Sequence, residues 1–251
     1  MSKIKRALII PDCHHPFAGP DYQLMTEVSQ EMVLDEIVIL GDFVDFYDIS
    51  SHPKSPQISE KLFDELHCAE EKLNELRKLF PNVPIFYCEG NHENRVSRFL
   101  QNQAPQLFGM FDLKSILNLD NKQISLVPYG PNQKHFVLGS NLIARHEPIG
   151  GGVHCAHSTV VKTQTSVIFG HTHRIQKSNI VALGTGEVYE GISCGWLGDK
   201  DHPVMGYVKN HHQWQTGWAV VDVIEDLNEF HVQLIHVKNG RAMVDGELYW
   251  L

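Results

Sequence analysis

The sequence has no long apolar run, no cysteine pattern and no excess of positive charge, and each absence excludes a class of protein. No stretch approaches the roughly 20 apolar residues that a membrane-spanning helix needs. The basic start, residues 1–6, runs directly into a strand-like segment without the apolar core of a secretory signal, so we expect no leader peptide. The five cysteines are odd in number and scattered, with no Cys-x-x-Cys pair, which indicates reduced thiols and a cytoplasmic location.

The net charge and the length of the chain further restrict the classes of protein to which it can belong. A net charge of −9 argues against a general nucleic-acid clamp, which carries a basic face, although a local basic patch is compatible with it. At 251 residues the chain can form one α/β domain, and no repeat, low-complexity tract or linker divides it, so we treat residues 1–251 as a single domain. The sixteen histidines are the most informative number, because histidine is the commonest metal ligand and titrates near neutral pH.

Apolar runs that end in polar side chains organise the chain. The run 37–40 is continuous and rich in β-branched residues, so it predicts a strand buried on both faces, and Gly41 and Asp42 follow it. This Gly-Asp pair alone could equally be a turn with a helix N-cap. In an open α/β sheet, however, ligands bind beyond the carboxyl ends of the strands. Five such runs end in Asp12 and His14, Asp42, Asn91 and His92, His146, and His171 and His173.

Helical periodicity and shorter strand-like segments fill the rest of the chain. Apolar stripes predict helices over residues 21–34 and 59–80, and a further helix that begins after Asn91. The less regular section 101–121 predicts short helices packed over the sheet edge. Residues 199–214 form a loop rich in histidine and aromatic residues. Further short strands are expected over residues 124–127, 136–138, 180–183, 187–194, 217–223, 230–237 and 248–251.

The side chains at the strand ends have the chemistry of a metal site. Asp12 and His14 are two residues apart, so in an extended segment they point to the same side and can bind one ion. Carboxylate, amide and imidazole ligands together suit Mn, Fe, Zn, Ni or Co better than calcium or a thiolate site. So many ligands favour two ions that share a bridging carboxylate, which is an arrangement used in phosphoester hydrolysis.

Taken in order, the motifs resemble the calcineurin-like metallophosphoesterase superfamily, in its stand-alone phage and bacterial form. The resemblance extends from residue 12 to residue 174, about two-thirds of the chain. It implies an α/β fold, a four-layer α/β/β/α sandwich of the metallo-dependent phosphatase type, with the site where the two sheets meet. The matching motifs are Asp12-x-His14, Gly41-Asp42-x-x-Asp45, Gly90-Asn91-His92-Glu93, His146 and Gly170-His171-x-His173.

The resemblance also implies a role for each residue and two divalent transition-metal ions, manganese first and Fe, Zn, Ni or Co as alternatives. Asp42 would bridge both ions, and a metal-bridging hydroxide would attack the phosphorus atom. His92 would act as general acid or as a positive partner of the phosphoryl oxygens. The first ion is assigned to Asp12, His14 and His173, and the second to Asn91, His146 and His171.

Some positions depart from the family pattern. Arg145 precedes His146 where glycine is common, and the nearby His154 and His157 are alternatives, although strand-end placement favours His146. Asp45 is expected to orient a histidine rather than bind a metal. Arg95 and Arg174 would either bind a substrate phosphate or form ordinary surface salt bridges.

The leading functional expectation is a phosphomonoesterase acting on nucleotides or similar small phosphate esters, with no membrane partner. Substrate selection is assigned to residues 46–56, 101–121 and 199–214. The first alternative is a DNA exonuclease or phosphodiesterase, in which nucleic acid is the partner. A protein phosphatase and a non-catalytic scaffold are further alternatives, and the complete ligand set argues against the scaffold. The exonuclease would need a basic rim from Lys114, Lys122, Lys134, Arg145, Lys162, Arg174 and Lys177.

Overall fold

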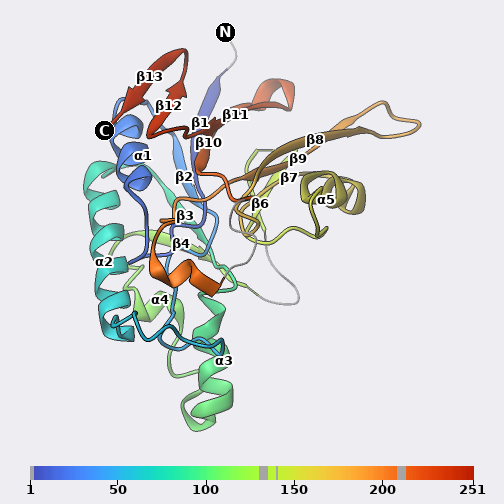
Figure 1. Ribbon diagram of the computed structural model, residues 1–251. Helices are drawn as coiled ribbons and strands as arrows, with labels where there is room; N and C mark the ends of the chain where they lie inside the picture. Colours follow the sequence, from blue (N-terminus) through green and yellow to red (C-terminus); the bar gives the residue numbers. More distant parts are fainter. Residues whose placement is uncertain (1–2, 130–134, 140, 208–212) are drawn as a thin grey trace.

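The computed structural model describes residues 3–129, 135–139, 141–207 and 213–251. Two β-sheets stack face to face, and helices cover their outer faces (Figure 1). Helices α1 (Pro20–Gln30) and α2 (Leu62–Leu79) lie on the left of the first sheet, and α5 (Cys155–Thr163) lies against the second sheet on the right (Figure 1). The predicted four-layer α/β/β/α arrangement is therefore confirmed.

The first sheet has six strands in the order β11-β10-β1-β2-β3-β4. Strands β1 to β4 are parallel, whereas β10 is antiparallel to β1 and β11 is antiparallel to β10. The carboxyl ends of β1, β2 and β3 therefore lie at one edge. The bounds are β1 (Ile4–Ile10), β2 (Glu36–Ile39), β3 (Ile85–Cys88), β4 (Ile124–Val127), β10 (Gly217–Ile224) and β11 (Glu229–His236).

The second sheet has five strands in the order β5-β6-β7-β9-β8. Strands β6, β7 and β9 are parallel, and the two outer strands, β5 and β8, are antiparallel to their neighbours. The carboxyl ends of β6 and β7 thus also share an edge. The bounds are β5 (Phe136–Val137), β6 (Leu142–Arg145), β7 (Ser166–Phe169), β8 (Ile175–Val181) and β9 (Val188–Cys194).

The alternation of side chains along β1 shows how one strand serves two cores. Leu8 and Ile10 join the cluster beneath α1 and α2, whereas Ala7 and Ile9 join the cluster between the two sheets. Successive side chains of a strand point to opposite faces, so a continuous apolar run is what a sheet covered on both faces requires. A smaller cluster packs α5 on the outer face of the second sheet.

Shorter elements connect and extend this framework. In the described part of the chain, no helix is both long and apolar enough to cross a membrane. The C-terminal hairpin buries Ala242 and Val244 in the core beneath α1 and α2. The remaining elements are α3 (Asn94–Gln103), α4 (Leu113–Ile116), β12 (Arg241–Val244), β13 (Glu247–Trp250) and the 3-10 helices Pro105–Leu107, Pro203–Tyr207 and Glu225–Leu227.

The structure corrects several expectations. Helix α5 is not predicted from the sequence, because it follows three glycines and contains β-branched residues that are weak helix formers. Strand β8 begins at Ile175 rather than at residue 180, since its alternating half-buried pattern carries few apolar residues. The expected packing of residues 101–121 over the sheet holds for Leu113 and Leu117, which are buried. It is wrong for Leu107, Phe108, Met110 and Phe111, which are 37–68% exposed.

A buried carboxylate attaches the segment after Asp45 to helix α2. Glu65 lies in the first turn of α2 and is 0% exposed. Its carboxylate accepts hydrogen bonds from the backbone N–H groups of Tyr47 (2.7 Å) and Asp48 (2.8 Å). Burial raises the pKa of Glu65 to about 7, more than the two hydrogen bonds lower it. The contact between Glu65 and the segment after Asp45 is therefore sensitive to pH near neutrality.

We expect the free energy of unfolding to fall as the pH rises from about 5 to about 8, partly because of Glu65. Its pKa is higher in the folded chain than in the unfolded chain, so the stabilisation is complete at low pH and is lost as the pH passes about 7. The loss is up to about 3 kcal/mol, at about 1.4 kcal/mol per pKa unit. Urea denaturation at a series of pH values should show a flatter profile for Glu65→Gln. Glu71→Gln, an exposed position on the same helix, should keep the wild-type slope, and equal slopes in all three proteins would contradict this role.

Candidate metal centre

The carboxyl ends of β1, β2 and β3 meet those of β6 and β7, and all eight residues predicted for the metal and catalytic roles come together there. Asp12 and His14 follow β1, Asp42 follows β2, and Asn91 and His92 follow β3. The second sheet supplies one residue after β6 and two after β7. These are His146, His171 and His173.

Asp12, His14 and His173 form one cluster of possible metal ligands. The Nε2 atoms of His14 and His173 are 3.1 Å apart. The Nε2 atom of His173 is also 3.4 Å from Oδ1 of Asp12. All three side chains are buried, so the donor atoms face one another rather than solvent.

Asn91, His146 and His171 form a second cluster with Asp42. The Asn91 Oδ1 atom is 2.9 Å from His146 Nε2 and 2.7 Å from His171 Nδ1. Oδ2 of Asp42 is 3.3 Å from His146 Nε2. Asp42 also groups with His14 and His92 within metal-ligand spacing. Asp42 is thus the residue through which the two clusters are joined.

The spacing and the chemistry of these atoms fit a transition-metal ion. Two ligand atoms at about 2.1 Å from one ion are separated by about 3.0 to 3.4 Å in octahedral or tetrahedral geometry. The donor atoms here are 2.7 to 3.4 Å apart. Carboxylate and amide oxygens are acceptors, so their convergence with imidazole nitrogens calls for a cation.

Hydrogen bonds set two of the imidazoles in the tautomer that a metal requires. The Nδ1 atom of His14 is 3.0 Å from Oδ2 of Asp45, and Nδ1 of His146 is 2.9 Å from the carbonyl oxygen of Leu40. Because both partners are acceptors, each Nδ1 carries the proton and donates it. The Nε2 atoms of His14 and His146 therefore point into the centre, where a metal ligand must present them.

The charges of the centre favour bound cations. Burial alone would raise the pKa of Asp42, but the imidazoles of His146 and His92 hold it well below its usual range. Burial lowers the pKa of His146, yet the Asp42 carboxylate raises it to about 10. Burial lowers the pKa of His173 to about 4, which keeps this ring neutral and its lone pair available.

The backbone that carries these side chains is unusual. Asp12, His14, Asp42, His171 and His173 all have positive φ angles, between 26° and 64°. Residues other than glycine rarely occupy this left-handed region, which costs about 1 kcal/mol or more for each residue and is typical of functional sites. The strand ends therefore turn sharply to aim their side chains at one point.

Two glycines of the motifs allow this close approach. A Cβ atom on Gly90 would overlap the backbone and the carboxylate of Asp42. A Cβ atom on Gly170 would overlap the carboxylate of Asp12, which accepts a hydrogen bond from the backbone N–H of His171 at 2.8 Å. Glycine at these positions thus has a packing reason that is specific to the centre.

Glu93 also belongs to the site, although its place in the Gly90-Asn91-His92-Glu93 motif predicts no role for it. Its carboxylate is 0% exposed and accepts five hydrogen bonds. These bonds hold the Asp42 loop against the turn after β3. The position of Glu93 directly after Asn91 and His92 is the sequence feature that indicates its place in the site. The donors are the backbone N–H groups of Asp42, Phe43, Val44 and Gly90, at 2.8 to 3.1 Å, and the hydroxyl of Tyr87, at 2.7 Å.

The two predicted arginines and Asp45 lie in different surroundings. Asp45 contacts His14, as described, and also accepts a hydrogen bond from Nη1 of Arg95 at 3.2 Å. Nη2 of Arg95 is 2.9 Å from Nε2 of His92, so Arg95 belongs to the centre. Arg174 instead donates to the carbonyl oxygen of Gly152 and to the side chain of Gln213.

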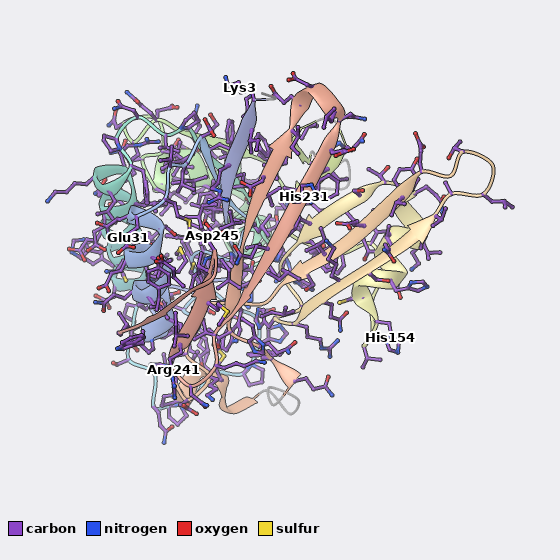
Figure 2. All side chains as sticks on the ribbon, turned by 90° about the horizontal axis from the view of Figure 1, so that it is seen from above. Lys3, Glu31, His154, His231, Arg241 and Asp245 are labelled. Carbon is purple, nitrogen blue, oxygen red and sulfur yellow. The ribbon has the colours of Figure 1, made fainter. Side chains whose placement is uncertain are left out.

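The alternative histidines lie outside the centre. His146 is 0% exposed, whereas His154 and His157 are exposed in the region of α5. Figure 2 shows His154 beside α5, well away from the first sheet. Of the predicted loop 199–214, residues 208–212 lie outside the described residues.

Two tryptophans form a wall beside the first cluster. The ring of His173 stacks on Trp196 at 11° with centroids 4.9 Å apart, and Trp214 meets His173 edge-on at 4.2 Å. Trp196 is buried, and Trp214 is partly exposed. Neither residue is singled out from the sequence as part of the metal site, because both are remote from the motifs.

Comparisons with known proteins identify the family of this chain. The family model of calcineurin-like phosphoesterases matches residues 5–175. The gene 54 proteins of the Mycobacterium phages L5 and D29 are each 26% identical over 262 residues, with 98% of both chains covered. Among solved structures, the phosphoesterase Yfce from E. coli is 13% identical, with 91% of this chain and 98% of that chain covered and a TM-score of 0.38.

The molecule is a hydrolase that acts on phosphate esters. The match covers well over half of the 251 residues and contains every motif of the centre. The chain belongs to the calcineurin-like phosphoesterase family, whose members typically bind divalent metal ions. The family predicted from the motifs is confirmed.

We expect Glu93→Gln to lower the free energy of unfolding by about 2 to 4 kcal/mol, because an amide NH₂ would face at least two of the donors that the carboxylate now satisfies. Tyr87→Phe is the matched control, since it removes one of the five hydrogen bonds and should cost only about 1 kcal/mol. Chemical denaturation of both variants without added metal measures this. Equal losses in the two variants would contradict the role of Glu93 as the support of the Asp42 loop.

A second prediction uses the tryptophan wall. Adding Mn²⁺ or Co²⁺ to chelator-treated protein should quench tryptophan fluorescence to saturation, because both ions are paramagnetic and His173 contacts Trp196 and Trp214. Trp214→Phe should lose a large part of this change. Trp250→Phe, at an exposed position in the C-terminal hairpin, should retain it. Absence of quenching, or quenching that only Trp250→Phe removes, would show that the metal binds elsewhere.

Proposed function

We propose that this chain is a dinuclear metal-dependent phosphohydrolase. The observation that carries the proposal is the position of Asp42 between two ligand clusters. In this assignment Asp12, His14 and His173 would hold one ion, Asn91, His146 and His171 would hold the other, and Asp42 would contribute a ligand to both. Residues 1–251 would act as one catalytic unit, because the C-terminal hairpin shares the core of the first sheet.

The mixed oxygen and nitrogen donors suit manganese first, with iron, zinc, nickel or cobalt as alternatives. When bound, two such ions supply Lewis-acid activation of water and neutralise the charge of the phosphoryl group. The protein contributes the fixed spacing of the ligands. His14 and His146 are oriented through their Nδ1 hydrogen bonds, and Asp45 supports His14 without facing an ion.

His92 is the residue we assign to proton transfer or to contact with the phosphoryl oxygens. Its Nδ1 atom donates to the carbonyl oxygen of Asp45 at 2.9 Å, which fixes the ring. Its Nε2 atom lies 3.8 Å from Oδ2 of Asp42 and 2.9 Å from Nη2 of Arg95. The positive guanidinium of Arg95 beside Nε2 would repel a metal cation at that atom, which supports a catalytic role rather than metal binding. A phosphate that accepts hydrogen bonds from Arg95 would release Nε2 to carry the proton that the leaving group needs.

Small phosphomonoesters, with nucleotides first, are the substrates we propose. Three of the six described residues of the basic rim that an exonuclease needs are engaged in ion pairs within the protein. Lys114 pairs with Asp120, Lys177 pairs with Glu190, and Lys122 is buried beside Glu70. Lys134 lies outside the described residues. These pairs support the small-molecule assignment over a nucleic-acid channel.

Two substitutions separate metal binding from turnover. Asp42→Asn should lose metal and activity together, because a neutral bridge weakens both ions. His92→Gln should keep about two equivalents of metal and lose roughly 100- to 10,000-fold in kcat, the usual contribution of a positioned acid. The measurements are elemental analysis after reconstitution with Mn²⁺, and hydrolysis of 4-nitrophenyl phosphate and of its bis-aryl diester.

The exposed His154 provides the control, and His154→Gln should behave as the wild type in both assays. Faster hydrolysis of the diester than of the monoester would favour the phosphodiesterase alternative. Full activity of His92→Gln would remove the role proposed for His92. Binding of less than one equivalent of metal by the wild-type protein would overturn the dinuclear assignment.

A further inference from the structure

A cavity of about 200 Å³ lies beside the metal centre, between the segment that follows Asp45 and helix α3. Figure 1 shows α3 at the lower end of the molecule, where the segment leading to α2 passes it. One wall of this cavity comes from residues 46–56, one of the loops expected to select the substrate, and the other comes from α3. The residues that matter here are Ser50, Ser51, Lys54, Arg95, Arg98 and Asn102.

Arg95 connects this cavity to the centre. Arg95 lines the cavity, and its guanidinium donates to the carbonyl oxygen of Asp45 and lies 2.9 Å from Nε2 of His92. Arg98 and Asn102 follow Arg95 at intervals of three and four residues, so they lie on the same face of α3. The helix thus presents a row of hydrogen-bond donors that begins at the proposed catalytic histidine and leads away from it.

The wall of the cavity is basic, although the chain as a whole is acidic. Arg95, Arg98 and Lys54 carry positive charge, and Asp48 is the one acidic residue of the wall. Arg95 pairs with Asp45 and Lys54 with Asp48, so the charge of Arg98 is the one that no described carboxylate neutralises. Asp48 is already engaged, because its carboxylate accepts from the backbone N–H of Leu62 at 3.1 Å and pairs with Lys54 at 3.6 Å. A basic concavity in a protein with a net charge of −9 concentrates anions locally.

Arg98 makes no contact with the described part of the chain that would explain it as a structural residue. Within the described residues, its guanidinium has no hydrogen bond or ion pair, and the residue is exposed. Arginine carries a planar fork of donors that matches a phosphate group and binds it in a bidentate manner. The hydroxyls of Ser50 and Ser51 and the amide of Asn102 add neutral donors to the same wall.

We propose that this cavity binds a second phosphate group of the substrate, with Arg98 as its principal partner, while the phosphate to be cleaved lies at the metal centre. The inference rests on the proposed function, because it takes the centre as the place of hydrolysis. The preferred substrates are then small esters with two phosphate groups, such as nucleoside bisphosphates, rather than simple monophosphates. Arg95 lies between the two phosphates and faces both positions.

The test compares adenosine 3′,5′-bisphosphate with adenosine 5′-monophosphate as substrates of the manganese-loaded protein. The wild type should show a KM for the bisphosphate that is roughly ten- to a hundredfold lower, as expected for one charge-assisted arginine–phosphate contact. Arg98→Ala should bring the two KM values together. Arg98→Lys should retain part of the difference, because lysine keeps the charge but lacks the fork. Hydrolysis of 4-nitrophenyl phosphate by the same preparations reports on the centre itself.

The control is Arg241→Ala. Arg241 is exposed on strand β12, and the hairpin that it belongs to lies at the opposite end of the molecule from α3 (Figure 1). This variant should keep the wild-type preference for the bisphosphate. A preference that Arg98→Ala leaves intact, or that Arg241→Ala removes equally, would overturn the proposed second-phosphate site.

Failure of the two proposals can be told apart by calorimetric binding of adenosine 3′,5′-bisphosphate to chelator-treated protein. Suppose that the protein hydrolyses none of these esters with any of the metals, but that it binds the bisphosphate and that Arg98→Ala weakens this binding. This result would support the second-phosphate site and refute the proposed hydrolysis. Hydrolysis of 4-nitrophenyl phosphate with no preference for the bisphosphate and no Arg98-dependent binding would refute the cavity and leave the centre standing.

Discussion

The mutual positioning of buried carboxylates at the joined edges of two sheets is the constraint on which the rest of the structure depends. Asp12, Asp42, Asp45 and Glu93 are all at most 4% exposed. A buried carboxylate is costly unless it is hydrogen-bonded or paired with positive charge. Here each one accepts hydrogen bonds from a different part of the chain, so the same groups that form the site also hold its loops together.

These contacts also connect the two sheets. Asp12, from the first sheet, accepts from the backbone N–H of His171, which follows a strand of the second sheet. His146, from the second sheet, donates to the carbonyl oxygen of Leu40 at the end of β2. Burial of the apolar layer holds the two sheets together, but hydrophobic burial is not directional and does not fix their exact relative position. The polar contacts at the edge then set the relative position of the strand ends, and with it the spacing of the ligands.

The sequence predicted the parts of this molecule that depend on periodicity and on the order of motifs, and missed the parts that depend on close packing. Continuous apolar runs predicted the central strands, and the polar residues after them predicted which side chains would meet. The left-handed backbone of Asp12, His14 and His171 could not be predicted, because it is imposed by neighbouring loops rather than by local preference. Helix α5 was missed because its β-branched residues are weak helix formers and the helix is stabilised by packing Cys155 and Ala156 on the second sheet.

The balance of charge explains why a metal site and this fold are mutually dependent. Asp12, Asp42, Asp45 and Glu93 are four buried acidic side chains, and both oxygens of Glu93 accept hydrogen bonds from backbone N–H groups. Arg95 is the one permanently charged side chain that pairs with any of the four in the described structure, through Asp45. The histidines can compensate only by taking up protons, and a protonated imidazole cannot bind a metal. Divalent cations at the proposed sites would offset the remaining negative charge of these carboxylates and so stabilise the same loops whose geometry selects them.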